Sequence, residues 1–392
     1  MGLPGVRLTA LAATAVLALT GCETVPFRSS GTPPSSVIGL GGATPYVDLP
    51  RSRTVQESTL IRTPLPSPGE RADRAAAGSP DVYAATGPDM LAAAARRLPA
   101  RLYVPHGTSV DVIDQRTLQP VGLIRTRSAV RQIVPSWDLK TLWVSAAQGL
   151  RPIDPRTGRI GRPVKMTGPY TLHFTPDGLS ALVVAGRRLE FRDPSTMALR
   201  STLELPCPAT GAADFSAGGE FLVASCDHTG GTSGLIRVDW LGGKVTHTLT
   251  LRSHPQDVRL GPDGTVFYVA DDDQVRVIDA TRLTQVGTVG TAPGSSSLLP
   301  SRDGASLYVG GRNTVSVLSF ATRALTHTWK VPTGSNLGGV SADGRTLWLY
   351  GPEQVLALSP STGRPLHHLA TPATHLTVYP QPGRYSLGQA FR

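Results

Sequence analysis

Short apolar runs separated by polar turns recur along the chain from residue 102 to residue 383. Each unit contains a segment of the Leu-Tyr-Val type, a segment of the Val-x-Val-Ile-Asp type, further apolar segments and a turn of the Ser/Thr-x-Asp-Gly type. The turns lie 39 to 45 residues apart, at residues 136–139, 175–178, 216–219, 261–264, 301–304 and 341–344, with a degenerate copy at 380–383. A fixed period of this length predicts a fold built from similar, adjacent units.

The units have the size of propeller blades, because about 40 residues accommodate four short strands joined by tight turns. Seven units fill residues 102–383. The first unit lacks an inner strand, and residues 375–379 align with the inner strands of the other units. The pattern therefore predicts an all-β, seven-bladed β-propeller of four-stranded antiparallel blades over residues 101–392, closed by the C-terminal strand. The 42 Gly and 34 Pro residues favour turns over long helices.

Residues 1–100 lack the repeat. An apolar run at residues 8–19 is too short to cross a bilayer as a helix, and it leads into Leu-Thr-Gly-Cys at residues 19–22. This ending resembles the bacterial lipobox and predicts a lipoprotein signal peptide at 1–21 with lipidation at Cys22; an ordinary secretory signal is the alternative. Residues 22–87, rich in Pro, Ser, Thr and Gly, predict a flexible tether. Residues 88–100 predict a short helix that docks on the propeller.

The signal predicts a lipid-anchored protein on the outer face of the cytoplasmic membrane, in the cell envelope. An exported protein does not meet chromosomal DNA, so nucleic acid is not an expected partner. With Cys22 acylated, Cys207 and Cys226 remain as an even pair in an oxidising space. Both fall in connections expected on the same face of the fourth unit, which favours a disulfide; two buried free thiols are the alternative.

The Leu-Tyr-Val segment stands at residues 102–104 and 307–309, and as Phe-Tyr-Val at 267–269. The segment that follows reads Val-Asp-Val-Ile-Asp at 110–114 and Val-Arg-Val-Ile-Asp at 275–279. These repeats resemble the exported YVTN-type β-propeller family. The resemblance implies a seven-bladed ring, and it implies no particular activity, so no catalytic residue is carried over. The fourth unit departs from the others by about five extra residues near 228–233.

Candidate ligand-binding residues lie where the inner strands start, because these starts converge on the ring axis. Seven residues before the third position of each turn stand Arg131, Tyr170, Gly211, Gln256, Ser296, Asn336 and His375. Arg131 can clamp an anion, Tyr170 can stack, and Gln256, Asn336 and His375 can make polar contacts. Solvated residues at the mouth of a water-filled channel are the alternative interpretation.

Three residues deeper, consecutive units carry His173, Asp214 and Arg259. A His beside a carboxylate and an Arg can form an acid–base group, and a hydrogen-bonded network between neighbouring blades explains the same residues. The three consecutive Asp at 271–273 are more typical of a turn than of a calcium loop. The sequence predicts no metal site and no cofactor, since haem-attachment, phosphate-loop and nucleophile-elbow motifs are missing.

Charge adds one feature, since the formal net charge of +10 lies mostly in residues 101–392. A basic propeller favours anionic surroundings at close range, and a scattered solvated surface is equally consistent with the count. The sequence thus favours a monomeric envelope lipoprotein that binds or scaffolds an envelope protein or an anionic glycan or peptide. Enzymatic activity stays open, with a propeller hydrolase of the lactonase type, using the polar residues of the channel mouth, as the alternative.

Overall fold

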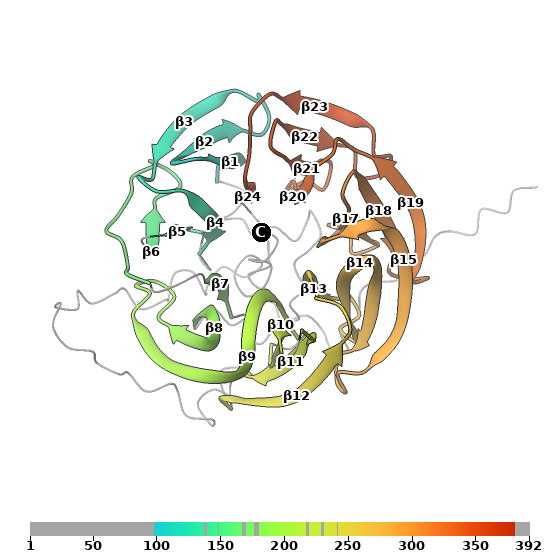
Figure 1. The fold of residues 1–392 in the computed structure, drawn as a ribbon. Helices are drawn as coiled ribbons and strands as arrows, with labels where there is room; N and C mark the ends of the chain where they lie inside the picture. The colour runs from blue at the N-terminus through green and yellow to red at the C-terminus, as the bar shows by residue number, and fades with distance from the viewer. Residues whose placement is uncertain are drawn as a thin grey trace, which may run out of the picture.

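The computed structural model describes residues 98–136, 139–147, 149–166, 170–175, 180–216, 219–228, 231–240 and 242–380, which form a ring of β-sheets (Figure 1). Every regular element among these residues is a strand. The part of the chain described here holds no helix with the length and hydropathy of a membrane span. The predicted signal peptide, Cys22, the tether and residues 88–97 of the predicted helix lie outside the described residues, and residues 98–100 are not helical.

The first three sheets lie on one half of the ring (Figure 1). The first contains β24 (Thr377–Tyr379), β1 (Arg101–His106), β2 (Ser109–Asp114) and β3 (Pro120–Arg125), in that order. The second contains β4 (Val130–Pro135), β5 (Leu142–Ala146) and β6 (Gly149–Ile153). The third contains β7 (Thr171–Phe174), β8 (Ala181–Arg192), β9 (Leu199–Phe215), β10 (Leu222–Asp227), β11 (Ser233–Asp239) and β12 (Lys244–Leu251).

The remaining three sheets complete the arrangement. The fourth contains β13 (Asp257–Leu260), β14 (Val266–Asp279) and β15 (Gln285–Ser295). The fifth contains β16 (Ser297–Pro300), β17 (Ser306–Gly310), β18 (Thr314–Ser319) and β19 (Ala324–Lys330). The sixth contains β20 (Asn336–Val340), β21 (Leu347–Tyr350), β22 (Val355–Leu358) and β23 (Pro365–Leu369).

The structure is therefore a β-propeller with six hydrogen-bonded sheets, and the expectation of seven separate four-stranded blades is not met by its sheet topology. The difference arises at β9, a strand of 17 residues. Its first part pairs with β8 and its last part pairs with β10, and Ala209 is a partner of both neighbours. Because the backbone continues without a break, two sequence units share one sheet.

The last described strand and the first lie side by side, since β24 pairs antiparallel with β1. Leu102 is opposite Val378 in this register. The side chain of Gln115 adds two hydrogen bonds across the junction, donating to the carbonyl of Arg101 at 3.0 Å and to that of Tyr379 at 2.8 Å. Residues about 270 positions apart in the chain are thus held in one sheet.

The hydrophobic core lies between neighbouring sheets. Middle strands such as β5 and β21 are buried along their whole length, whereas the rim strand β19 is exposed at nearly every position. The tyrosines of the Leu-Tyr-Val segments belong to this packing. Tyr103 donates a hydrogen bond to the carbonyl of Pro155 at 3.3 Å, and Tyr308 donates one to the carbonyl of Pro360 at 3.1 Å. Each hydroxyl thereby reaches a turn of the next unit, which explains why a tyrosine suits this position.

The Val-Ile-Asp segments end in side-chain-capped turns. Asp279 accepts hydrogen bonds from the amides of Thr281 at 3.0 Å and Arg282 at 2.7 Å, and Asp114, Asp154 and Asp193 make the same kind of turn. Burial raises the pKa of the Asp193 carboxyl, but hydrogen bonds from Ser195 and Thr196 outweigh it and the net pKa is lowered. The motif Asp is thus a turn-forming residue.

Candidate functional site

A cavity of about 320 Å³ lies where the inner strands β13, β16 and β20 approach one another. Three residues that the sequence placed at the channel mouth, Gln256, Ser296 and Asn336, line it together. Its wall is completed by Asp257, Arg259, Ser297, Leu298, Leu299, Leu337, Tyr350 and Thr374. The cavity combines a few polar groups with apolar side chains, which is the usual composition of a small-ligand site.

Two of the predicted mouth residues keep their polar side chains close to the backbone beside this cavity. The Gln256 amide donates to the carbonyl of His254 at 3.4 Å, and the Asn336 amide donates to that of Gly334 at 3.1 Å. Each amide keeps its side-chain oxygen as a further acceptor. Both residues are half-buried, so they can exchange these local bonds for contacts to a ligand.

The innermost charged group of the cavity is the pair Asp257–Arg259. Asp257 is 1 % exposed and Arg259 is fully buried, and Nη1 of Arg259 lies 2.7 Å from Oδ1 of Asp257. The Asp257 carboxylate also accepts from the amides of Val258 at 2.8 Å and Leu298 at 2.9 Å. Sequence reasoning missed Asp257, although it stands two residues before Arg259 and strand alternation places both on one face.

The other edge of the guanidinium is buried and unsatisfied. Nε and Nη2 of Arg259 are buried and have no hydrogen-bond partner among the described residues. These two nitrogens form one edge of the guanidinium plane, so their N–H groups point in parallel. A carboxylate or phosphate can accept from both at once.

Arg259 does not join His173 and Asp214 in the acid–base group that the sequence suggested, because the carboxylate partner of Arg259 is Asp257. Asp214 accepts from the amide of Phe215 at 2.8 Å and from the amide of Leu260, on the neighbouring strand β13, at 2.9 Å. Asp214 thus bridges successive inner strands in the same way as Asp257. These bonds match the alternative interpretation, a hydrogen-bonded network between blades.

The remaining predicted mouth residues lie elsewhere. Tyr170 belongs to the hydrophobic core, where burial raises the pKa of its hydroxyl, so its ring is not an open stacking face. His375 is fully buried, with its ring 5.8 Å from that of Tyr350. Arg131 is exposed and does not line the cavity of Arg259. The seven-residue count found the right end of each inner strand but did not fix which side chains reach the cavity.

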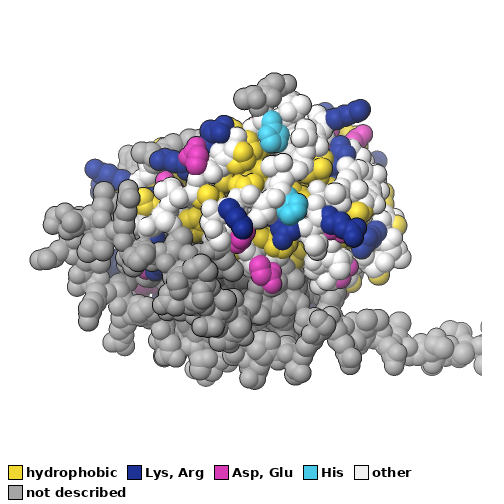
Figure 2. Space-filling view, turned by 90° about the horizontal axis from the view of Figure 1, so that it is seen from below, with side chains coloured by type: hydrophobic (Ala, Val, Ile, Leu, Met, Phe, Trp, Pro, Cys, Tyr) yellow, Lys and Arg dark blue, Asp and Glu magenta, His cyan; other side chains and the backbone are white. Residues whose placement is uncertain are grey.

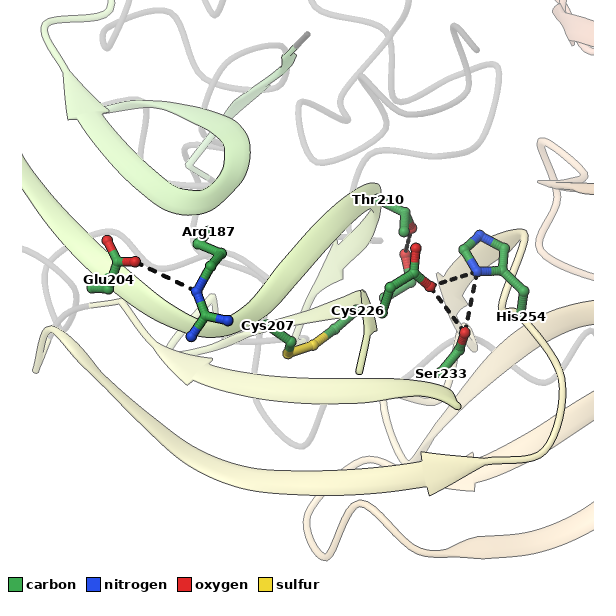
Figure 3. The surroundings of a disulfide bond; sticks show 9 residues. Arg187, Glu204, Cys207, Thr210, Cys226, Ser233 and His254 are labelled. Carbon is green, nitrogen blue, oxygen red and sulfur yellow. Dashed lines mark hydrogen bonds and ion pairs between the residues drawn. A yellow bond between two sulfur atoms is a disulfide. The ribbon is translucent and has the colours of Figure 1, made fainter. Parts of the chain in front are cut away.

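A disulfide joins Cys207 on β9 to Cys226 on β10, with a Cα–Cα distance of 5.7 Å (Figure 3). This is the pairing expected from the sequence. Cys226 lies next to the hairpin between β10 and β11, where the fourth unit has its extra residues. The bond therefore holds the base of the one loop that distinguishes this unit.

Beside the disulfide, Asp227, Ser233 and His254 form a hydrogen-bonded cluster, of which Figure 3 labels Ser233 and His254. Nδ1 of His254 lies 2.8 Å from Oδ1 of Asp227 and 3.3 Å from Oγ of Ser233, and Ser233 also donates to the same carboxylate oxygen at 2.9 Å. In a nucleophile–base–acid arrangement the serine meets the ring nitrogen opposite the carboxylate. Here both partners share Nδ1, so the cluster closes the loop and does not activate the serine.

Two further polar features are the three consecutive Asp and a groove between two sheets. The three consecutive Asp, for which a turn was expected, lie within strand β14, where Asp272 has a φ of +49°. Asp271 is buried and lies 2.5 Å from Nε of Arg276. A groove of about 680 Å³ between the fifth and sixth sheets is lined by Tyr308, His327 and Trp329 among others. On the uncovered part of the face in Figure 2, Lys and Arg side chains are scattered, and several have an Asp or Glu beside them.

No protein-family model and no curated protein matches this chain. Solved structures match it in fold. A functionally unknown protein from Desulfotomaculum acetoxidans is 18% identical, with 70% of this chain and 96% of that chain covered and a TM-score of 0.58. Hydrazine synthase of Kuenenia stuttgartiensis is 17% identical, with coverage of 67% and 90% and a TM-score of 0.55. The Cps50 (Swd1) β-propeller domain of Myceliophteria thermophila is 12% identical, with coverage of 62% and 86% and a TM-score of 0.52. At these identities the likeness shows the β-propeller fold alone.

Proposed function

We propose that this chain is a cell-envelope lipoprotein whose β-propeller is a binding or scaffolding module for an envelope protein or an anionic glycan or peptide. The observation that carries the proposal is the parallel N–H edge of Arg259, buried in the cavity without a partner among the described residues. A buried donor that lacks an acceptor costs about 1–3 kcal/mol. A ligand that supplies the acceptor recovers this free energy.

The charges of the cavity define the ligand group. Asp257 pairs with one side of Arg259, and the unused capacity of the guanidinium is for hydrogen-bond acceptors on its other side. A carboxylate on an acidic sugar or peptide accepts from both N–H groups. Gln256 and Asn336, which line the same cavity, supply further donors and acceptors for hydroxyl or amide groups around it.

The anchored location is part of the proposal. The signal peptide at 1–21, acylation of Cys22, the tether at 22–87 and the membership of the YVTN-type family are supported by the sequence motifs. We expect a monomer attached to the outer face of the cytoplasmic membrane. Metabolic labelling with a clickable fatty acid should mark the wild-type chain and not a Cys22→Ala variant. Labelling of both forms would refute lipidation at Cys22.

We further propose that the ring is built from seven sequence units, each of which forms one blade. Strands β8 and β14 each pair with the inner neighbour through their first part and with the outer neighbour through their second part. Each therefore supplies two of the four strands of one unit. On this proposal, the six-stranded sheet is two adjacent blades joined through β9, and the pairing of β24 with β1 supports closure by the C-terminal strand.

The ligand test compares two like-for-like substitutions. Arg259→Lys keeps a cation beside Asp257 and removes the parallel N–H edge. Arg131→Lys makes the same change at an exposed position outside the cavity. Crosslinking with mass spectrometry in the native envelope should recover the same partner with the wild type and Arg131→Lys, and at least about tenfold less of it with Arg259→Lys, because a lost charge-assisted bond is worth about 1.5–3 kcal/mol. Equal recovery from all three forms would refute the assignment of the site.

A further inference from the structure

The loop that follows the disulfide carries a histidine at its base. Cys226 lies on β10, and His228 follows two residues later, where its amide donates to the carbonyl of Thr232 at 2.8 Å. Cys207 and Cys226 are 1 % and 0 % exposed, and His228 is half-buried. The loop thus holds an imidazole against a buried pair of sulfur atoms.

The three possible ligand atoms are close together. Sγ of Cys207, Sγ of Cys226 and a ring nitrogen of His228 all lie within 4.8 Å of one another. Nε2 of His228 is buried and has no hydrogen-bond partner among the described residues. A Cβ atom on Gly234 would stand only 3.1 Å from this nitrogen, so the glycine leaves the space that the ring occupies. A buried imidazole nitrogen without a partner, on a ring that lies beside two cysteine sulfur atoms, is the environment of a metal ligand.

We propose that Cys207, Cys226 and His228 form a redox-controlled site for a thiophilic cation of the Zn²⁺ type, which binds when the disulfide is reduced. Tetrahedral Zn²⁺ with Zn–S distances of about 2.3 Å and Zn–N distances of about 2.0 Å requires ligand atoms about 3.5–3.8 Å apart. The Cα–Cα distance of 5.7 Å lets the two sulfur atoms separate to this spacing by side-chain rotation. The fourth position is left for water, as in open zinc sites.

The chemistry balances with a dithiol reductant. A protein or small-molecule dithiol breaks the Cys207–Cys226 bond, is itself oxidised to a disulfide, and leaves two thiols on this chain. Zn²⁺ then replaces the two thiol protons, which leave to solvent, and the neutral His228 imidazole donates its Nε2 lone pair. The disulfide and the metal are mutually exclusive, because both use the same two sulfur atoms.

The test uses the full chain in two redox states. The oxidised protein and the same protein reduced with a phosphine and desalted without oxygen are each titrated with Zn²⁺ against a chromophoric chelator. We expect one Zn²⁺ per reduced chain and none on the oxidised chain. Co²⁺ in place of Zn²⁺ should give the thiolate-to-metal charge-transfer absorption of a two-sulfur site. Zn²⁺ should also slow the return of the disulfide in air, as measured by titration of free thiols.

Variants separate the proposed site from other metal-binding groups. His228→Ala leaves the disulfide intact, and in the reduced form it should lower Zn²⁺ affinity by at least about tenfold, because even outer-shell groups contribute this much. His247→Ala, at an exposed position on β12, is the matched control and should bind like the wild type. Equal Zn²⁺ affinity for the reduced wild type and reduced His228→Ala, or no binding by the reduced wild type, would overturn the proposal.

Discussion

Removal of the Asp257 carboxylate should destabilise the propeller strongly. In Asp257→Ala, the amides of Val258 and Leu298 lose their acceptor, and Nη1 of Arg259 keeps only its bond to the carbonyl of Val258 at 2.7 Å. The guanidinium of Arg259, which is fully buried, also loses its counter-charge. Breaking a buried ion pair from one side costs about 3–5 kcal/mol. Because Leu298 belongs to the next inner strand, β16, the loss includes a direct bond between neighbouring sheets.

The assay is urea unfolding of the full chain followed by tryptophan fluorescence, since the chain contains five tryptophans. Asp257→Ala should lower the free energy of unfolding by about 3–5 kcal/mol. The double variant Asp257→Ala/Arg259→Met should recover part of this loss, because it no longer buries an unpaired charge. Asp263→Ala is the control, since its ion pair with Arg323 is exposed and spans 3.7 Å. Exposed pairs contribute about 0–1 kcal/mol.

Two results would refute this reasoning. A loss of less than about 1 kcal/mol for Asp257→Ala would mean that the buried pair contributes no more to stability than an exposed ion pair. A double variant no more stable than Asp257→Ala would show that the buried charge of Arg259 is not the source of the loss. The comparison with Asp263→Ala separates both from a general effect of removing one negative charge.

The remaining predictions concern backbone space, alkaline pH and the disulfide. Gly149→Ala should lower the free energy of unfolding by more than about 2 kcal/mol, because φ is +119° and its Cβ would lie 2.1 Å from a backbone oxygen. Gly107→Ala, at φ +55° with open space around it, should lower it by about 1 kcal/mol, as measured by thermal unfolding. Burial raises the pKa of Tyr103 from 10 to about 12, so the folded state holds the phenol proton more tightly than the unfolded state. The urea midpoint of unfolding should therefore fall as the pH rises from 10 to 12, and Tyr103→Phe should make this decline shallower. Reduction of the disulfide, which closes a 19-residue separation between Cys207 and Cys226, should lower the free energy of unfolding by about 3 kcal/mol, and a Cys207→Ser variant should show no further loss with reductant.

Local turn chemistry could be predicted from the sequence. The Ser-x-Asp-Gly turns require a positive φ at glycine, and Gly304 and Gly344 have φ of +67° and +71°. Ser301 donates to Asp303 at 2.5 Å within one such turn. These contacts involve residues two or three apart, so the sequence contains everything that determines them. The period of about 40 residues follows from the same turns and predicts the propeller.

The boundaries between sheets were decided by tertiary structure. The sequence units end at each turn, but the backbone of β9 continues from one unit into the next and bonds with strands on both sides. Whether a connection bends away or stays in register depends on the neighbouring strands, and this information is not local. The repeat alone therefore predicted separate blades where the structure has a shared sheet.

The candidate site also has a part that the sequence predicted and a part that only the tertiary structure decided. The sequence by itself determined the repeat, the turns, the start of each inner strand and the two cysteines that could pair, because each depends on spacing along one segment. Only the tertiary structure decided that Gln256 and Asn336 share a cavity while Tyr170 and His375 are buried. Side chains at equivalent positions differ because each meets a different neighbouring sheet, and the N–H edge of Arg259 is left without a partner while Asp257 occupies its other side.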